Sequence, residues 1–137
     1  MRGVFDASAI VNLAINGGSK AIDAVSGGSG LTLTFFEIGN SVWKLHSLQK
    51  KLSEDDARSL LEVSLQLYSQ LEVFSFTRSE ALEIAKLASA RRVTFYDSDY
   101  LFASKKENGL PLITDDERLA RAARTEKIET FTSASII

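Results

Sequence analysis

The sequence predicts an α/β fold in which a central, mostly parallel sheet of four or five short strands is flanked by helices. Short apolar runs of strand length alternate with longer segments that begin at helix cap signals. Such alternation favours a parallel sheet that is covered on both faces. The 137 residues fit a single domain over residues 1–137, and they show no internal repeat or linker.

The first elements lie between residues 3 and 33. Gly3–Asp6 is expected to form a short buried strand, and the apolar segment Ser8–Ile15 a helix. A second short helix is predicted over Ser19–Val25. Gly27–Gly30 lacks the Lys-Ser/Thr pair of a phosphate-binding loop and precedes a strand, so we interpret it as a flexible connection. Leu31–Leu33 is then expected to form the second strand.

Two cap signals mark the helices of the middle segment. Thr34 with Glu37 three residues later fits a capping box, which predicts a helix from Phe35 to about Lys50. The acid-rich start at Ser53 repeats the cap signature and predicts a long helix to about Tyr68. The apolar run Leu71–Phe74 is expected to form the third strand.

The C-terminal third repeats the same alternation. A capped helix is predicted from Thr77 to about Arg91, and the next from Thr94 to the Asn108-Gly109 stop signal. Leu110–Thr114 is expected to be a strand with Pro111 at its start. Thr114 is expected to cap a helix to about Arg124, and Ile128–Phe131 to form a last strand.

The composition excludes several classes of site. The chain has no cysteine, which excludes disulfides, iron–sulfur clusters and thiolate zinc sites. No apolar run approaches the roughly 20 residues that cross a bilayer, and the first residues show no signal-peptide pattern. We therefore expect a cytoplasmic protein without a membrane partner.

The net charge of −2 does not by itself indicate a nucleic-acid-binding protein. A metal that neutralised a cluster of acids would leave the remaining surface mildly basic. The basic clusters are otherwise interpreted as solvated helix faces. They are Lys50-Lys51, Arg91-Arg92, Lys105-Lys106 and Arg118/Arg121/Arg124.

Carboxylates recur where predicted elements begin or end. Asp6 and the pair Asp115-Asp116 directly follow strands, so they are expected at the carboxyl edge of the sheet, where functional crevices open. Glu37 and Asp97 begin helices, whose N-termini can pack against the same edge. Clustered carboxylates repel one another, and oxygen ligands suit Mg²⁺ or Mn²⁺, which can activate a water against a phosphodiester.

A purely structural interpretation of these acids stays open. Acids in a first helical turn can serve only as caps, and they complement the helix dipole. Asp6 fits that account less well, because it closes a strand after two apolar residues. His46 is the only histidine and is expected to be partly exposed and structural, and Trp43 is expected to pack in the core. The three pairs that fit capping boxes are Thr34…Glu37, Thr94…Asp97 and Thr114…Glu117.

Four segments in a fixed order resemble the PIN domains of the VapC toxin type, and the likeness extends from about Val4 to Ala123. The matching segments are Asp6-Ala7-Ser8, Glu37 to Lys44, Thr94 to Leu101 and Leu112 to Leu119. The resemblance implies a PIN-like nuclease domain that acts as a metal-dependent endoribonuclease. It also implies one or two Mg²⁺ or Mn²⁺ ions, an RNA substrate, a cognate antitoxin in a type II toxin–antitoxin pair, and a homodimer.

The resemblance also implies roles for individual residues. Asp6 and Asp97 would be the most direct metal ligands, and Glu37 and Asp116 would complete the catalytic pocket and orient water. Asp99 and Asp115 stand where relatives often carry apolar or small residues, so each is either an additional ligand or a solvated neighbour. The polar positions that would support the acids are Thr114, Ser8 and Asn40.

Three other functions stay open at this point. A phosphoacceptor domain would need an acid pair after its first strand and a lysine after its last, and this sequence has neither. A catalytically silent PIN fold could act as a binding module for RNA or a protein. A PIN nuclease of RNA maturation, without an antitoxin, would use the same four acids.

Overall fold

The computed structural model describes residues 1–137 and contains a five-stranded sheet in which every pair of neighbouring strands is parallel. The order across the sheet is β3-β2-β1-β4-β5, so β1 is central. The predicted α/β class and parallel sheet are confirmed. The strands are β1 (Val4–Phe5), β2 (Ser29–Leu31), β3 (Glu72–Phe74), β4 (Leu112–Ile113) and β5 (Thr130–Phe131).

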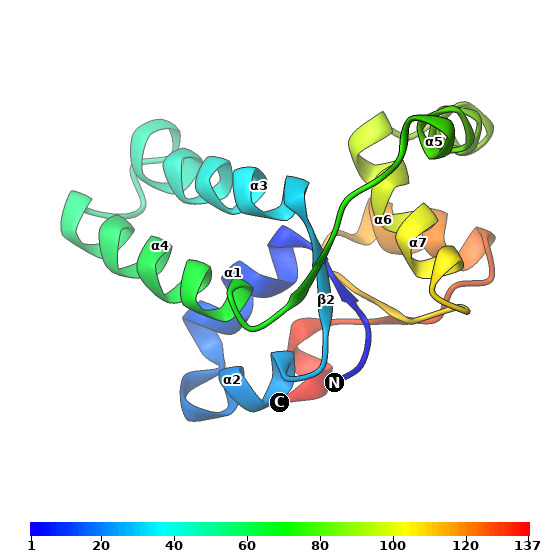
Figure 1. The fold of residues 1–137 in the computed structure, drawn as a ribbon. Helices are drawn as coiled ribbons and strands as arrows, with labels where there is room; N and C mark the ends of the chain where they lie inside the picture. Colours follow the sequence, from blue (N-terminus) through cyan, green and yellow to red (C-terminus); the bar gives the residue numbers. More distant parts are fainter.

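Seven α-helices cover the two faces of the sheet (Figure 1). Helices α1 to α4 lie on one side and α5 to α7 on the other, and the two chain ends lie close together. Helix α1 packs on α3 and α4, while α6 packs on α5 and α7. The helices are α1 (Ala7–Asn16), α2 (Ala21–Val25), α3 (Thr32–Trp43), α4 (Glu54–Tyr68), α5 (Arg78–Arg91), α6 (Phe95–Lys106) and α7 (Glu117–Thr125).

None of these helices is long and apolar enough to cross a lipid bilayer.

The two strands β1 and β4 each contribute to both hydrophobic cores. Val4 and Leu112 belong to the core under α6 and α7, whereas Phe5 and Ile113 belong to the core under α1 and α4. This division follows from the twofold side-chain period of a strand, which sends successive residues to opposite faces. Strands of only two residues are therefore sufficient to anchor both layers, and all four side chains are fully buried.

The strand order creates a topological switch point between β1 and β4. The chain builds β1, β2 and β3 outward in one direction, then returns to place β4 on the other side of β1. In parallel sheets, a crevice opens at the carboxyl ends of the two strands that flank such a point. Asp6 directly follows β1 and Thr114 directly follows β4, so both lie at this crevice.

The glycine-rich segment differs from its prediction. Instead of a flexible connection followed by a strand at Leu31–Leu33, the strand itself begins at Ser29, and Thr32 and Leu33 already belong to α3. The physical reason is close packing. A Cβ atom on Gly28 would lie 2.5 Å from Cε2 of Phe5, so only a residue without a side chain fits there.

The cap predictions for α3 and α6 have different outcomes. Thr34 lies inside the first turn of α3, where its hydroxyl accepts a hydrogen bond from the Leu31 N–H at 3.0 Å, so the predicted cap is wrong. Glu37 consequently lies beyond the first turn and caps nothing. Thr94 is confirmed as the cap of α6, because its hydroxyl accepts the Asp97 N–H at 3.0 Å. The Asp97 carboxylate makes no return bond, which leaves it available to the crevice.

Two further predictions concern the end of α3 and the turn that follows it. His46 is confirmed as partly exposed and structural, with Nδ1 2.9 Å from the carbonyl oxygen of Leu52. The prediction of a buried Trp43 is wrong, because 51% of it is exposed. The buried stripe of α3 contains Val42, and the adjacent residue on a helix points to a different face.

The packing of Gly28 gives a test of the fold. We expect Gly28→Ala to lower the free energy of unfolding by about 1–3 kcal/mol, because the new methyl group collides with Phe5 and with the carbonyl oxygen of Val25. Gly39→Ala in α3 is the matched control, since its Cβ would meet no atom within 4 Å. There we expect a gain of about 0.5–1 kcal/mol from reduced backbone entropy. Urea denaturation measures both; equal effects of the two changes would contradict the packing.

Candidate active site

A cavity of about 360 Å³ opens at the crevice between β1 and β4, and four carboxylates line it. Asp6 follows β1, Glu37 comes from α3, Asp97 from the first turn of α6, and Asp116 from the residue that caps α7. The fold thus brings together the four acids that the sequence selected. Asp6 is the most deeply buried of them, with only 5% of its surface exposed.

Asp6 is held by three hydrogen bonds. Its Oδ1 accepts the hydroxyl of Ser8 at 2.7 Å and the N–H of Ala9 at 2.9 Å, which caps α1. Its Oδ2 accepts the hydroxyl of Thr114 at 2.5 Å. These bonds join the ends of β1 and β4 through the carboxylate itself, so the orientation of Asp6 is fixed before any ligand arrives.

Backbone amides determine where the two hydroxyl protons point. The Ser8 hydroxyl accepts the Asp115 N–H at 2.9 Å, and the Thr114 hydroxyl accepts the Asp116 N–H at 3.0 Å. Each hydroxyl therefore has its own proton available for donation to Asp6. The loop after β4 in this way directs two hydroxyl groups onto one buried carboxylate, as expected of the supporting positions Ser8 and Thr114.

Glu37 is held by a second chain of the same design. The Leu31 N–H donates to the Thr34 hydroxyl, which lies 2.9 Å from the Tyr100 hydroxyl, and Tyr100 donates to Glu37 Oε1 at 2.5 Å. Because the Tyr100 proton points to Glu37 and the Thr34 oxygen already accepts an N–H, Thr34 donates to Tyr100. Sequence reasoning did not identify Thr34 or Tyr100 in this role.

Spacing on the helices gives the signal that could have found these two residues. Tyr100 lies three residues after Asp97 on α6, and Thr34 lies three residues before Glu37 on α3. Residues three apart share a helix face, so each polar residue lies beside an acid. The bond between Tyr100 and Glu37, however, joins two helices, and no local pattern predicts it.

Asp116 and Asp97 form the other side of the cavity. Asp116 caps α7, because its Oδ1 accepts the N–H groups of Arg118 at 2.9 Å and Leu119 at 3.3 Å. The prediction that Thr114 caps this helix is wrong, since the Thr114 hydroxyl is engaged with Asp6. The Arg118 guanidinium lies 3.9 Å from Asp97 and is the one ion-pair partner of the four acids.

Burial and mutual repulsion shift the acids towards their protonated forms. Burial raises the pKa of Asp6 to about 7, despite its three hydrogen bonds, and the charge of Glu37 adds to the rise. Burial also raises the pKa of Glu37, where Asp97 and Asp116 contribute repulsion and Tyr100 acts in the opposite direction. The pKa of Asp97 is raised by burial and by Asp116, and lowered by Arg118. Such a cluster is stabilised by a cation.

Asp99 and Asp115, which the sequence left as either additional ligands or solvated neighbours, lie outside the cavity lining. Asp99 is 8% exposed, and its Oδ1 has no hydrogen-bond partner. Burial, together with the charge of Glu37, raises its pKa to about 6, so it is not a solvated neighbour. Asp115 accepts the N–H of Ser133 at 2.9 Å and the side-chain amide of Asn12 at 2.8 Å. It fastens the C-terminal segment to α1.

Helix α3 and the π-helical segment that continues it (Lys44–Leu48) add residues to the cavity that the sequence analysis did not select. Asn40, which was expected, lines it together with Ser41 and Lys44. With Glu37 they follow the spacing of one helix face, which is a signal that the sequence already contained. Lys44 and Arg118 thus stand on two sides of the carboxylates and are the cations in the lining.

The donor chemistry of the cavity fits a hard divalent cation. The donors are carboxylate oxygens, the chain has no cysteine, and His46 is not among the lining residues. No three acids already lie close enough to coordinate one ion together. Asp6 and Glu37 are held by hydroxyl chains, whereas the side chain of Asp97 is approached only by Arg118.

Comparison with known proteins agrees with this geometry. A model of the PIN domain matches residues 4–125. The chain is 32% identical over 103 residues to Exonuclease VapC9 from Pyrobaculum aerophilum, across 74% of this chain and 71% of that protein. It also resembles the crystal structure of PAE2754 from Pyrobaculum aerophilum, with a TM-score of 0.77 and 25% identity, over 98% of this chain and 92% of the other. The chain therefore belongs to the PIN domain family and is a nuclease of the VapC type.

Proposed function

We propose that this protein is a metal-dependent endoribonuclease and the toxin of a type II toxin–antitoxin pair. The observation that carries the proposal is the single cavity in which Asp6, Glu37, Asp97 and Asp116 meet at the switch point of the sheet. Membership of the PIN family supports nuclease chemistry there. PIN domains in general depend on divalent metals, which agrees with the repulsion among these acids.

The residues that would hold one or two Mg²⁺ or Mn²⁺ ions are the same four acids. When bound, such an ion lowers the pKa of a water and offsets the charge that develops on a phosphate. Asp6 retains one acceptor position, since Oδ1 takes two donors and Oδ2 takes one. That position is the one it offers to an ion.

Glu37 is placed to take a proton from the attacking water. Its Oε1 accepts the hydrogen bond from Tyr100, which leaves Oε2 as the free oxygen. The raised pKa of Glu37 lies closer to neutral pH than that of an ordinary glutamate, which suits a general base. The water oxygen bonds to phosphorus as the P–O3′ bond breaks, and the proton of that water passes to Oε2. The departing O3′ keeps the electron pair of the broken bond and takes a proton from bulk water. Lys44 and Arg118 attract the phosphate. The products have 3′-hydroxyl and 5′-phosphate ends, as the family likeness implies.

Two parts of the proposal are that the substrate is RNA and that cleavage is internal. The relative VapC9 is named an exonuclease, so removal of terminal nucleotides is the second candidate activity. Internal cleavage is supported by the shape of the site. The acid cavity shares residues with neighbouring pockets, so a bound strand has room to continue beyond it.

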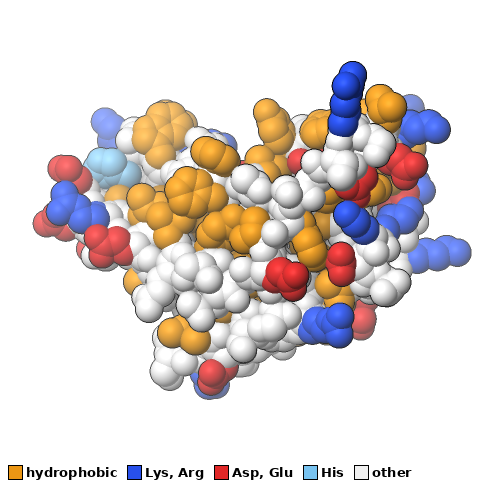
Figure 2. Space-filling view, in the orientation of Figure 1, with side chains coloured by type: hydrophobic (Ala, Val, Ile, Leu, Met, Phe, Trp, Pro, Cys, Tyr) orange, Lys and Arg blue, Asp and Glu red, His pale blue; other side chains and the backbone are white.

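The partners belong to the proposal as well. Figure 2 shows apolar side chains gathered over α3 and α4. Trp43 of α3, Val63 of α4 and Leu48 between these helices are exposed by 51%, 41% and 62%, which supports a homodimer or an antitoxin contact there. A PIN nuclease of RNA maturation would lack the antitoxin, and a gene for a small DNA-binding protein beside this one distinguishes the two. We place the protein in the cytoplasm.

Cleavage of a circular RNA tests the proposed activity. We expect the pure protein to open a circular single-stranded RNA with Mn²⁺ or Mg²⁺ and to be inactive in chelator. A circular RNA has no end for an exonuclease to attack, so its opening identifies internal cleavage. Asp6→Asn should reduce cleavage at least about 100-fold. Asp23→Asn, at an exposed acid of α2, should leave it unchanged. Cleavage of linear RNA alone would favour the exonuclease, and full activity of Asp6→Asn would contradict the site.

The pKa of Asp6 predicts how stability depends on pH in chelator. Asp6 ionises near pH 7 when folded and near 3.8 when exposed, so between these values the unfolded chain has released a proton that the folded one retains. The free energy of unfolding should therefore fall as pH rises from about 4 to about 7. Asp6→Asn should flatten this fall.

Urea denaturation across that pH range measures this dependence. At neutral pH, Mn²⁺ should raise the melting temperature of the wild type and not that of Asp6→Asn, because only the wild type gains from neutralising the cluster. Identical slopes for the two proteins, or an equal effect of Mn²⁺ on both, would contradict the arrangement.

Tyr100 is predicted to be a positioning residue that acts through Glu37. Tyr100→Phe should reduce kcat about 10- to 100-fold, as losses of groups that orient ligands do. Because the Tyr100 hydrogen bond lowers the pKa of Glu37, the acid limb of the pH–rate profile should also shift to higher pH. A structural role alone would not move that limb.

The matched control for this change is Tyr68→Phe. The Tyr68 hydroxyl donates to the carbonyl oxygen of Leu31 at 2.9 Å and does not line the cavity. Tyr68→Phe removes one hydrogen bond and Tyr100→Phe removes two, and each lost bond costs about 1 kcal/mol in stability. Only Tyr100→Phe should alter the pH–rate profile, and an unshifted profile in that variant would show that the bond does not tune Glu37.

A further inference from the structure

Two further pockets share residues with the acid cavity. The acid cavity is the central one. It shares Arg118 with a cleft of about 280 Å³ between the end of α5 and α7. On its other side it shares Glu37, Asn40 and Tyr96 with a pocket on α3 and the start of α6. One shared residue thus joins the acid cavity to the arginine cleft, and three join it to the other pocket; we call the three pockets together the track.

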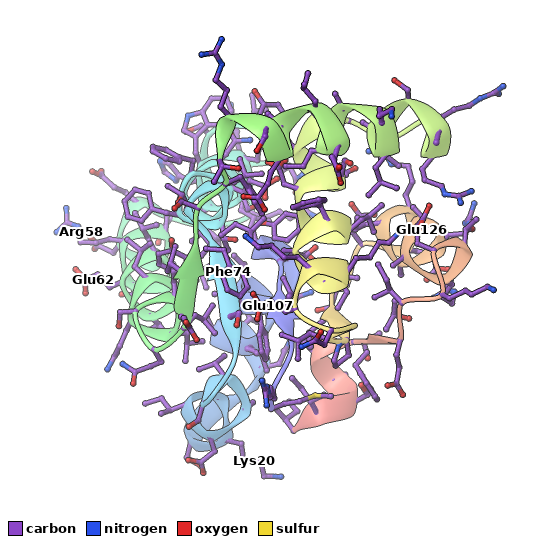
Figure 3. All side chains as sticks on the ribbon, turned by 45° about the vertical axis from the view of Figure 1, so that its right-hand side comes forward. Lys20, Arg58, Glu62, Phe74, Glu107 and Glu126 are labelled. Carbon is purple, nitrogen blue, oxygen red and sulfur yellow. The ribbon has the colours of Figure 1, made fainter.

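The cleft beside α7 is lined by four arginines and by no acid. Arg91 and Arg92 come from the end of α5, and Arg118 and Arg121 from one face of α7. Arg91 forms an ion pair with Glu126, which Figure 3 labels beside α7.

Arg92 and Arg121 are exposed and form no ion pair, so both are free to bind an anion. Guanidinium groups match phosphate oxygens in geometry and charge, and they remain protonated under all ordinary conditions. The two unpaired arginines in one cleft therefore offer two positions for phosphate contacts.

The pocket on the opposite side has aromatic walls. Phe36 is 66% exposed and Tyr96 is 60% exposed. Together with Leu33 they line this pocket beside Glu37, which also belongs to the acid cavity. Exposed aromatic rings of this kind stack on unpaired bases, and they do so with little preference for sequence. A duplex presents no free base faces, so this pocket fits a single strand.

We propose that single-stranded RNA lies along this track, with its backbone phosphates beyond the scissile bond held by Arg92 and Arg121 and a base stacked on Phe36 and Tyr96. This inference rests on the proposed nuclease function and adds the substrate class and its binding sites. An acidic protein could also occupy the arginine cleft. The shared Arg118 and the aromatic pocket across the acid cavity favour RNA, because one strand contacts all three pockets.

Binding in chelator tests the track without cleavage. Fluorescence anisotropy of a labelled single-stranded oligoribonucleotide, titrated at several salt concentrations, measures affinity and its salt dependence. We expect the double variant Arg92→Gln/Arg121→Gln to bind more weakly. The slope of log affinity against log salt should become shallower by about 1.4, which is about 0.7 for each lost phosphate contact.

The matched control removes two charges elsewhere. Lys20 and Arg58 are exposed and lie away from α7 in Figure 3, so Lys20→Gln/Arg58→Gln lowers the net charge by the same amount. It should leave the salt slope unchanged. Equal slopes for the two double variants would overturn the inference. The inference would also be overturned if the variant Arg92→Gln/Arg121→Gln kept RNA binding and lost only the binding of poly-glutamate. That result would indicate an acidic protein partner.

The aromatic side has its own pair of variants. Phe36→Ala should weaken binding about tenfold, within the range that base stacking contributes. Leu82→Ala, at a residue of α5 that is 72% exposed, should leave the affinity unchanged. Unchanged affinity in Phe36→Ala, with loss of a dimer instead, would assign this pocket to subunit contact and overturn this part of the track.

Cleavage assays separate a failure of the track from a failure of the proposed function. If the wild type cleaves RNA but the arginine variant binds as the wild type does, the track is wrong and the nuclease stands. If no RNA is cleaved under any metal condition but the binding differences appear as expected, the nuclease proposal is wrong. The chain then binds single-stranded RNA through the same track.

Discussion

The burial of a negatively charged side chain at the centre of the sheet is the constraint on which the rest of the structure depends. Asp6 is almost fully buried at the junction of β1 and β4, at the inner end of the acid cavity. A carboxylate there needs donors, and Ser8, Ala9 and Thr114 supply them. Those same bonds tie two strands and a helix together, so the charge that is costly to bury also organises the site.

The two hydroxyl chains fix two of the four acids and leave the other two less constrained. Asp6 and Glu37 are each held by a relay that starts at a backbone N–H, so their orientations follow from the fold. Asp116 is fixed only through one oxygen as a helix cap, and Asp97 is approached only by Arg118. A site with two fixed and two adjustable carboxylates can accept an ion and a phosphate without rebuilding its frame.

The weak overall charge of the chain conceals a separation of charges on its surface. The acids of the cavity and the arginines of the neighbouring cleft nearly cancel in the net charge of −2, but they occupy different pockets. The acid cavity would repel a nucleic acid on its own. Lys44 and Arg118 at its rim, with the arginine cleft beyond, offset that repulsion and make an approach by a phosphate backbone electrostatically favourable.

The sequence by itself determined the class of the fold and drew attention to Asp6, Glu37, Asp97 and the pair Asp115-Asp116, because these depend on local features: alternating strand and helix patterns, and acids placed where elements begin or end. The choice of Asp116 over Asp115 came from the family resemblance. Asp6 and Asp116 could be assigned to one edge since parallel strands all end there. Only the tertiary structure decided that Tyr100 bonds to Glu37 and that Asp115 turns away to the C-terminal segment. These bonds join residues that are 63 and 18 positions apart, and each competes with local alternatives such as caps. No periodicity encodes the outcome, since it depends on how whole helices pack.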